Sequence, residues 1–339
     1  VDDSNFMRKA LSKLIMSEPG FEVVEMASNG YDALRKLSSV KPDAITLDVE
    51  MEGMDGLTTL KKIMESPNPT SVIMFSAYTK SGADITVNSL REGAVDFMEK
   101  PSGALSMDLG AVRDELIRKL RVAARVTPMR KSAEPLIDRK TTRSVRLPRA
   151  KSSIVAIGSS TGGVQALNSI IPKLPEDFPL PIVIVQHMPP LFTKTLADGL
   201  NKESKVSVKE GEEGDVLKPG CVYIAPGGLH MTVRKAGSDV MIHLDKNPEG
   251  ELLRPSVDVL FRSVADLYGG NVLGVVLSGM GNDGFEGMKV LRAKGAVGMA
   301  QNEATCVVYG MPKFVIEANL VDVALPLSSI ALHIEASVS

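Results

Sequence analysis

The sequence predicts an α/β fold with two domains, each a doubly wound parallel sheet that helices cover on both faces. Short apolar runs alternate with segments in which apolar residues recur at helical spacing, a rhythm typical of parallel sheets. The rhythm runs through residues 1–120, stops, and resumes at residue 153. A chain of 339 residues, 44% of them hydrophobic, is long enough to bury a core in each half.

The first region, residues 1–120, contains the first set of expected elements. The expected strands are the apolar runs 22–26, 44–47, 71–75 and 94–98. The expected helices are 30–37, 57–64 and 109–120, where apolar residues follow the helical period.

Residues 121–152 interrupt this rhythm, and we interpret them as a basic flexible linker. Lys and Arg far outnumber the two acidic residues of this stretch, Glu134 and Asp138. The stretch has no aromatic side chain on which a nucleic-acid base could stack. A solvated linker is therefore favoured over a nucleic-acid contact.

The second region, residues 153–339, repeats the alternation without repeating the sequence. Strands are expected at 154–157, 181–185, 221–225, 271–277 and 296–300, and helices at 163–171, 257–266 and 287–293. A second α/β domain follows from this pattern.

Composition argues against several classes of protein. The net charge of -2 gives no general reason to bind DNA or an anionic membrane. Cys221 and Cys306 lie far apart, fit no metal or redox spacing and suit a reducing cytoplasm. No apolar run approaches the roughly 20 residues that span a bilayer, and the first residues lack the pattern of a signal peptide. We therefore expect a cytoplasmic protein that is not inserted in a membrane and binds no nucleic acid.

Acidic side chains stand at the expected carboxyl ends of strands in the first region. Asp2, Asp3 and Asp48 would meet at one edge of the sheet and repel one another unless a cation such as Mg2+ lies between them. Ser76 and Lys100 also follow strands. A phosphoryl group on one Asp would find a metal ion, a hydroxyl and an ammonium group there. Five such residues in this order favour a phosphoryl site over a set of solvated turn residues.

These residues resemble a two-component receiver domain over roughly residues 1–120. The matching motifs are Asp2-Asp3, Leu47-Asp48-Val49-Glu50-Met51, Met54-Asp55-Gly56, Ser76-Ala77 and Lys100-Pro101. The resemblance implies a flavodoxin-like sheet and phosphorylation of Asp48 by a histidine kinase. It also implies that Mg2+ lies among Asp2, Asp3, Asp48 and the backbone at Glu50, and that Phe97 is a switch aromatic beside Ser76 and Lys100.

The chain departs from receivers at two points. Glu52 stands where Pro is usual, which would alter the loop beside Asp48. Receivers begin with a buried apolar strand, and here only Val1 of it precedes the acidic pair. A sheet lacking that strand would expose apolar faces and unpaired edges, so we expect the natural protein to start upstream.

In the second region, a glycine-rich loop at 158–163 follows a strand and opens a helix. Ser160 lies at the centre of a G-x-S-x-G pattern, the form of a nucleophile elbow. Amides of the following helical turn could stabilise an oxyanion. A phosphate cradle explains this loop equally well, although the P-loop Lys is absent and the glycines do not fit G-x-G-x-x-G.

Two residues further along the chain favour the nucleophile. His187 ends an apolar strand, where its ring could accept the proton of Ser160, and His230 is a second candidate. Asp283 follows another strand and could orient the imidazole, with an Asx turn as the structural alternative. Asp258 is a rival acid inside an expected helix. The order Ser, His, Asp differs from that of α/β-hydrolases and argues for an unrelated fold.

These stretches resemble the catalytic domain of the chemotaxis protein-glutamate methylesterase family, CheB. The matching segments are IGSSTGG at 157–163, QHMPP at 186–190, YIAPG at 223–227, RPSVD at 254–258, GMGNDG at 279–284 and AQNE at 300–303. They span nearly all of 153–335, in the receiver, linker and esterase order of the family. The resemblance implies a Rossmann-like methylesterase domain with a triad of Ser160, His187 and Asp283. It also places Thr161 and the backbone of Met280 near the reacting carbonyl.

Together the two resemblances imply a phosphorylation-regulated serine esterase. It would hydrolyse glutamate γ-methyl esters on methyl-accepting chemotaxis receptors for sensory adaptation, releasing methanol, with no cofactor for the esterase step. The expected partners are a chemotaxis histidine kinase as phosphodonor and the receptors as substrate. Deamidation of receptor glutamines, an activity of some family members, is left open. A response regulator that binds nucleic acid and a nucleotide-binding domain are the alternatives, and neither explains His187 and Asp283.

Overall fold

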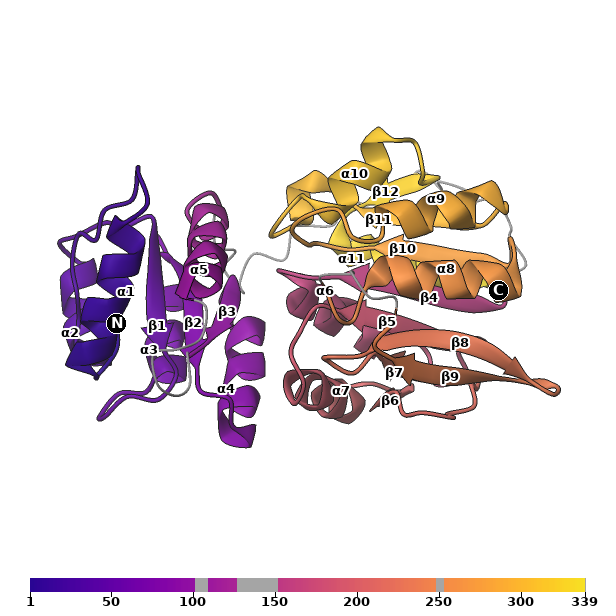
Figure 1. Ribbon diagram of the computed structural model, residues 1–339, viewed down its shortest axis with the longest axis horizontal. Helices are drawn as coiled ribbons and strands as arrows, with labels where there is room; N and C mark the ends of the chain where they lie inside the picture. Colours follow the sequence, from indigo (N-terminus) through magenta and orange to yellow (C-terminus); the bar gives the residue numbers. More distant parts are fainter. Residues whose placement is uncertain (101–108, 127–151, 248–252, 339) are drawn as a thin grey trace. The chain divides into compact units, whose positions relative to one another are not determined.

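The computed structural model describes residues 1–100, 109–126, 152–247 and 253–338. The chain divides into two compact units, residues 1–136 and 137–339, and each is described by itself (Figure 1). Most of the expected linker, residues 127–151, lies outside the described residues. Among the helices that the structure describes, none combines the length and the apolar character needed to cross a membrane.

The first unit is built on a parallel sheet with the strand order β1-β2-β3. The strands are β1 (Ala44–Asp48), β2 (Ser71–Ser76) and β3 (Asp96–Glu99). The helices are α1 (Asn5–Met16), α2 (Gly30–Leu37), α3 (Gly56–Glu65), α4 (Lys80–Arg91) and α5 (Leu109–Ala123). Helix α5 packs on the three strands and on α1, whereas α2, α3 and α4 pack in succession and α4 covers β2 and β3. Because α5 runs to Ala123, the first residues of the expected linker are helical.

The expected strand at 22–26 is absent from the structure, and this prediction is wrong. A strand is defined by hydrogen bonds to a neighbour, and here the backbone contact is made by Asp2, whose amide donates to the Ala27 carbonyl at 3.2 Å. Val1 lies on the β1 side, where its carbonyl accepts from the Asp48 amide at 3.0 Å. Among the described residues, the Asp2 amide therefore makes the one backbone hydrogen bond that joins residues 22–27 to a neighbouring segment, and a single bond cannot pair five residues as a strand.

The second unit is a parallel sheet with the order β12-β11-β10-β4-β5-β7-β6. Its strands are β4 (Ile154–Ser159), β5 (Ile182–Gln186), β6 (Ser207–Glu210), β7 (Cys221–Ile224), β10 (Val272–Val276), β11 (Val297–Gln301) and β12 (Val323–Leu325). A separate antiparallel hairpin joins β8 (His230–Ala236) and β9 (Asp239–Asp245). The central strands β4, β5 and β10 are buried throughout, as expected where helices cover both faces.

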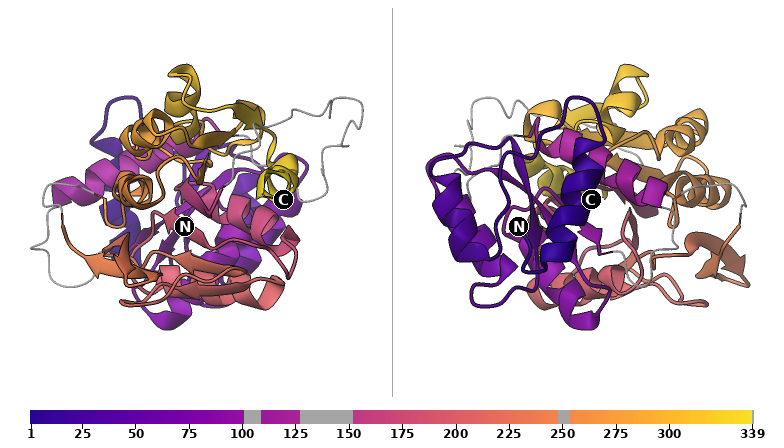
Figure 2. Two further views of the ribbon diagram at one scale, coloured as in Figure 1. Left: turned by 90° about the vertical axis from the view of Figure 1, so that its right-hand side faces the viewer. Right: turned by 60° about the vertical axis from the view of Figure 1, so that its left-hand side comes forward.

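The helices of the second unit lie on both faces of this sheet. They are α6 (Gly163–Ile170), α7 (Phe192–Glu203), α8 (Val257–Tyr268), α9 (Phe285–Ala293), α10 (Met311–Glu317) and α11 (Leu327–Val338), with short 3-10 turns η1 (Ile171–Lys173) and η2 (Glu303–Thr305). Figure 2 shows α8 and α9 on one side of the sheet and α6 and α11 on the other. The α/β fold class is thereby confirmed for both units.

Strand β4 is the switch point of the second sheet. The chain continues from β4 to β5 on one side, and β10 pairs with β4 on the other. Open α/β sheets bind ligands at the carboxyl ends of strands beside such a point. The loops after β4, β5 and β10 are therefore the ones that form a site.

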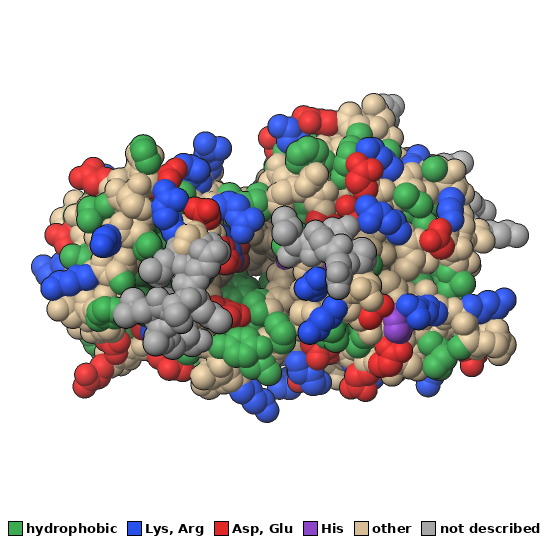
Figure 3. Space-filling view, viewed as in Figure 1, with side chains coloured by type: hydrophobic (Ala, Val, Ile, Leu, Met, Phe, Trp, Pro, Cys, Tyr) green, Lys and Arg blue, Asp and Glu red, His purple; other side chains and the backbone are tan. Residues whose placement is uncertain are grey.

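Charged side chains of both signs are interspersed over each unit in the view of Figure 3. This distribution agrees with the net charge of -2. A mixed surface of this kind gives no general attraction to a polyanion.

Candidate active site

Ser160 lies directly after β4, between this strand and α6. Its amide donates to the Ser278 carbonyl at 3.0 Å, and its carbonyl accepts from the Gly163 amide at 2.7 Å. The side chain is half-buried at the carboxyl edge of the sheet. The backbone of the candidate nucleophile is thus held on both sides.

The sharp turn of this loop lies at Gly162 and not at Ser160. Gly162 has φ 81° and ψ -5°, the values of the third residue of a type II turn, and it is the N-cap of α6. A Cβ there would lie 2.5 Å from the Cβ of Val307, so both conformation and space require glycine. Ser160 itself does not have a positive φ; among the described residues other than glycine, only Leu191 and Asn319 do. The loop therefore differs from the strained elbow that G-x-S-x-G predicts in α/β-hydrolases.

His187 follows β5 on the same edge of the sheet. The pairing of β4 with β5 aligns Ser159 with Gln186, and the His187 amide donates to the Ser159 carbonyl at 3.1 Å. Ser160 and His187 are therefore the next pair beyond the ladder. Within the described chain, the Ser160 hydroxyl is not hydrogen-bonded to the His187 ring; such bonds are often long in a free enzyme and shorten with substrate.

The His187 ring is bound to Asp283. Nε2 lies 2.7 Å from Oδ2, and the two side chains are only 11% and 9% exposed. An ionised carboxylate only accepts hydrogen bonds, so Nε2 carries the proton and Nδ1 is the basic nitrogen. This tautomer leaves Nδ1 to accept a proton from a nucleophile.

The Asp283 carboxylate is held by the N-terminus of α8. Oδ2 accepts from the Val257 amide at 2.7 Å, and Oδ1 accepts from the Asp258 amide at 2.9 Å and the Ser256 hydroxyl at 3.0 Å. Burial raises the pKa of Asp283, but hydrogen bonds from His187 and the two amides outweigh it and bring the pKa below its usual value. Asp283 is therefore ionised at neutral pH and can stabilise an imidazolium.

The rival base and acid lie elsewhere. His230 is the fully buried first residue of β8. The Asp258 carboxylate accepts from the Gly287 amide at 2.6 Å and faces Arg262 at 3.8 Å. Among the His and Asp candidates named from the sequence, the side chains of His187 and Asp283 are the pair that is hydrogen-bonded.

Thr161 and Met280 flank Ser160. Thr161 is 7% exposed, and its carbonyl accepts from the Ser278 hydroxyl at 2.8 Å. A Cβ on Gly279 would lie 2.9 Å from the Ser160 Cβ, so the backbone leading to Met280 passes directly beside the candidate nucleophile. No hydrogen bond joins the Met280 amide to another described residue.

Sequence reasoning overlooked two buried polar residues that hold this site together. Gln186, 2% exposed, donates from Nε2 to the Ser160 carbonyl at 2.9 Å. Ser256, 1% exposed, is the N-cap of α8 and donates to Asp283. The available signals were a polar residue that ends the buried apolar run of β5, and a Ser directly before a helix.

Three carboxylates meet in the first unit, as the sequence predicted. Asp2, Asp3 and Asp48 each offer one oxygen, and these oxygens lie within 4.8 Å of one another. Asp2 and Asp48 are each 1% exposed, and Asp2 Oδ2 is buried without a hydrogen-bond partner. A buried carboxylate oxygen that lacks a donor is what a hard cation satisfies, so the residues fit Mg2+.

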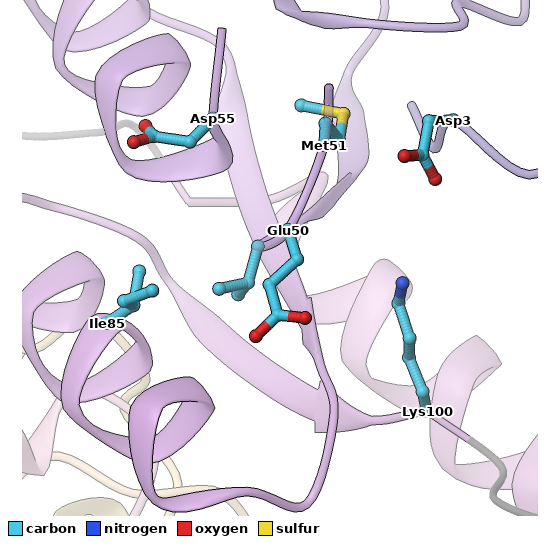
Figure 4. A pocket seen from close by; sticks show the side chains of 7 residues that line it. Asp3, Glu50, Met51, Asp55, Ile85 and Lys100 are labelled. Atoms are coloured by element: carbon cyan, nitrogen blue, oxygen red, sulfur yellow. The ribbon is translucent and has the colours of Figure 1, made fainter. Parts of the chain in front are cut away.

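Lys100 reaches this cluster. Its Nζ lies 2.6 Å from Asp48 Oδ2 and 3.7 Å from Asp2 Oδ2, and the Glu50 amide donates to Asp48 Oδ1 at 3.1 Å. Burial raises the pKa of Asp48, although Lys100 opposes the shift. Asp3, Glu50 and Lys100 are among the residues that line an open pocket of about 560 Å³. Figure 4 shows their side chains. A phosphoryl group on Asp48 would enter a site with an ammonium already in place.

The remaining residues named for the receiver take different positions. Ser76 is the buried last residue of β2, and its carbonyl accepts from the Lys100 amide at 2.8 Å. Its hydroxyl donates to the Ala77 carbonyl at 3.2 Å. Phe97 is 5% exposed, and Lys119 Nζ lies 5.3 Å from its ring centre. Ser76 thus adjoins the cluster, whereas Phe97 is a core side chain in this structure.

Comparison with known proteins agrees with this geometry. Residues 155–334 match the family model described as CheB methylesterase, and residues 1–108 match the response regulator receiver domain. The protein-glutamate methylesterase/protein-glutamine glutaminase of Halalkalibacterium halodurans is 46% identical over 98% of this chain and 95% of its own length. The protein of the same name from Archaeoglobus fulgidus is 47% identical over the same shares. The crystal structure of the Thermotoga maritima CheB methylesterase catalytic domain is 45% identical, with a TM-score of 0.53, over 54% of this chain and 97% of that chain. The chain belongs to the CheB methylesterase family and carries that family's receiver domain.

Proposed function

We propose that this chain is a serine esterase that hydrolyses glutamate γ-methyl esters on chemotaxis receptors and releases methanol. The observation that carries the proposal is the buried His187–Asp283 pair, 2.7 Å apart, at the sheet edge beside Ser160. The name shared by the matched relatives supports the substrate. A phosphate cradle, the alternative for this loop, has no use for an ionised carboxylate in the same crevice.

The proposed chemistry uses the tautomer that Asp283 selects. His187 Nδ1 takes the proton of the Ser160 hydroxyl while Oγ attacks the ester carbonyl carbon. Collapse of the tetrahedral intermediate breaks the bond to the methoxy oxygen, which receives the proton from His187 and leaves as methanol. Water then gives a proton to His187 and attacks the acyl-enzyme, and Ser160 recovers its proton as glutamate is released.

Backbone amides would bind the oxyanion of both intermediates. The Ser160 amide already donates to the Ser278 carbonyl, so other amides are needed. Thr161 and Met280 flank Ser160 and supply them in this proposal. Loss of one such donor costs on the order of 10²–10³ in kcat in other hydrolases.

The same intermediate would allow a second activity. Attack of Ser160 on a glutamine side-chain amide gives the same acyl-enzyme and releases ammonia. The glutaminase part of the relatives' name supports this deamidation.

Regulation is proposed to act through Asp48. A chemotaxis histidine kinase would phosphorylate it, and Asp2, Asp3 and Asp48 would hold the Mg2+ that shares the charge of the phosphoryl group. Phosphorylation would shift the population from a form in which the receiver covers the crevice around Ser160 toward an open form.

Methanol release from methylated receptor membranes tests the proposal. We expect release by the full chain to increase with acetyl phosphate and Mg2+, and to vanish in Ser160→Ala with the fold intact. Undiminished release by Ser160→Ala would refute the serine mechanism. Residues 153–339 alone should exceed the unphosphorylated full chain; equal rates would exclude simple occlusion.

A further inference from the structure

We propose that Gln186 is a positioning residue that fixes the peptide group between Ser160 and Thr161 and so aims the Thr161 N–H at the reacting carbonyl. The proposal rests on the serine esterase function proposed above. It concerns a buried side chain that needs no contact with substrate. Gln186 acts through the backbone of two residues of the site.

The Gln186 side chain joins the nucleophile loop to the histidine loop. Its Nε2 donates to the Ser160 carbonyl at 2.9 Å and to the His187 carbonyl at 3.2 Å, and Oε1 accepts from the Ser159 hydroxyl at 2.8 Å. The residue is 2% exposed and ends β5. All three hydrogen bonds of this amide therefore lie within the strand ends that carry Ser160 and His187.

The orientation of the Gln186 amide follows from its partners. The carbonyls of Ser160 and His187 can only accept, so the nitrogen must face them and the oxygen must face the Ser159 hydroxyl. Reversing the amide would place an oxygen against two carbonyl oxygens in a buried site. The donor is thus fixed toward Ser160.

A fixed carbonyl determines where the next N–H points. The peptide group is planar and trans, so the Thr161 N–H points away from the direction of the Ser160 carbonyl. Gln186 and the Gly163 amide both donate to that carbonyl, at 2.9 and 2.7 Å. Together they fix the carbonyl toward Gln186 and the first residue of α6, so the N–H faces away from both. In this proposal that is the side on which a substrate carbonyl meets Ser160 Oγ. Preorganised donors of this kind lower the barrier because they need no reorientation during the reaction.

The first residue of α6 leaves room for Gln186. A Cβ on Gly163 would lie 2.1 Å from Gln186 Oε1 and 2.7 Å from the Ser159 Cβ. Any larger residue at 163 would displace the amide. The glycine-rich loop therefore accommodates the positioning side chain as well as the turn.

Ser159 offers a matched control. It is fully buried and belongs to the same network, but it contacts the acceptor end of the amide. Ser159→Ala removes that bond and leaves both Nε2 bonds in place. Gln186→Met removes every hydrogen bond at similar volume, and Gln186→Glu keeps an oxygen for Ser159 while removing both donors.

The experiment compares these variants of the full chain, activated with acetyl phosphate and Mg2+, for methanol release over a range of methylated receptor concentrations. We expect Gln186→Met and Gln186→Glu to lower kcat about 10- to 100-fold and to leave KM within about threefold of the parent. The reason is that a wrongly oriented N–H loses its hydrogen bond to the oxyanion, an interaction that exists only in the transition state. Ser159→Ala should keep kcat within about fivefold, and its melting temperature should fall by less than that of Gln186→Met, because it loses one of the three hydrogen bonds. Melting curves show which variants fold, and Gln186→Glu serves if Gln186→Met does not.

Two results would overturn the positioning role. One is a folded Gln186 variant whose kcat stays within about threefold of the parent. The other is a loss of kcat in Ser159→Ala equal to that in Gln186→Met, which would indicate that Gln186 acts through packing alone. Ser160→Ala, assayed in parallel, distinguishes a failure of the serine mechanism from a failure of the positioning role. If it stays active, the serine mechanism itself fails, whereas an inactive Ser160→Ala beside active Gln186 variants removes only the positioning role.

Discussion

Replacing Asp283 by Asn tests the arrangement of the site most directly, because the change keeps the shape and alters only the charge and one set of lone pairs. Oδ1 accepts from three donors: the Ser256 hydroxyl and the amides of Asp258 and Gly284, at 3.0, 2.9 and 3.0 Å. Oδ2 accepts from the remaining pair, the His187 ring and the Val257 amide. An Asn has one oxygen and must choose between these two positions.

The structure predicts which position the Asn oxygen takes. With its oxygen at Oδ1 it keeps three hydrogen bonds, so its NH₂ group faces the Val257 amide and the His187 ring. The ring then has to present Nε2 as an acceptor and carry its proton on Nδ1. A protonated Nδ1 cannot accept the proton of Ser160. The comparable change in a serine protease lowers kcat about 10⁴-fold through the wrong tautomer, and at 1.36 kcal/mol per decade this corresponds to about 5.4 kcal/mol.

The same substitution should change stability and its dependence on pH. Leaving the Val257 amide without its acceptor costs about 1–3 kcal/mol of unfolding free energy. The pKa of Asp283 lies below its usual value of 3.8 in the folded chain. The stabilisation it gives is therefore complete above the unfolded pKa and is lost as pH falls through the lowered folded pKa. The gap between parent and Asp283→Asn should be full at neutral pH and should narrow below about pH 4.

Two measurements test the predictions for Asp283→Asn. Methanol release by parent and Asp283→Asn, activated alike, gives the ratio of kcat, and chemical unfolding from pH 3 to pH 7 gives the stability gap. If Asp283→Asn keeps kcat within about tenfold of the parent, Asp283 does not select the tautomer and the reasoning is refuted. A stability gap that widens toward low pH would contradict the lowered pKa.

Three further predictions concern the receiver and the loop. Asp48→Asn should remove the stimulation of methanol release by acetyl phosphate, and a variant that still responds would place the phosphoryl group elsewhere. Mg2+ should raise the melting temperature of the unphosphorylated chain, because Mg2+ at a hundred times its Kd for the site adds about 2.7 kcal/mol to the free energy of unfolding. Changing the exposed Asp3 to Asn should abolish most of this rise in melting temperature. Gly163→Ala should destabilise the chain and lower kcat, because the new Cβ would lie 2.1 Å from Gln186 Oε1; a variant with parental melting and activity would show that the loop moves aside without consequence.

The central strands of both sheets could be predicted because strands that are buried on both faces consist of uninterrupted apolar residues. Strands β4, β5 and β10 were expected within a few residues of their observed bounds. The short edge strands β6 and β12 were not expected, since half-exposed strands of three or four residues carry little pattern. Helix α4 was also missed, although Thr79 caps its first turn, because its sequence KSGADITVNSLR lacks a clear apolar face.

The error at 22–26 has a different origin. The run EVVEM has the composition of a strand, and sequence patterns report composition and period. Whether a strand forms depends on a neighbour with which to exchange hydrogen bonds, and that neighbour is specified elsewhere in the chain. Local pattern alone cannot supply this information.

The site shows the same division between local signal and assembled geometry. Ser160, His187 and Asp283 were named because each stands after a strand. The ring nitrogen that we propose as the base, and the residue that we propose to orient the Ser160 peptide, depend on contacts across the fold. The His187–Asp283 bond joins residues 96 positions apart, and their strands β5 and β10 are not neighbours, because β4 with Ser160 lies between them. The carboxylate reaches across β4 because the N-terminus of α8 holds it there. In the proposed mechanism, three strand ends and one helix must therefore be in place at once before His187 can act as a base toward Ser160. Partial folding of the second unit would leave all three side chains present and the esterase inactive.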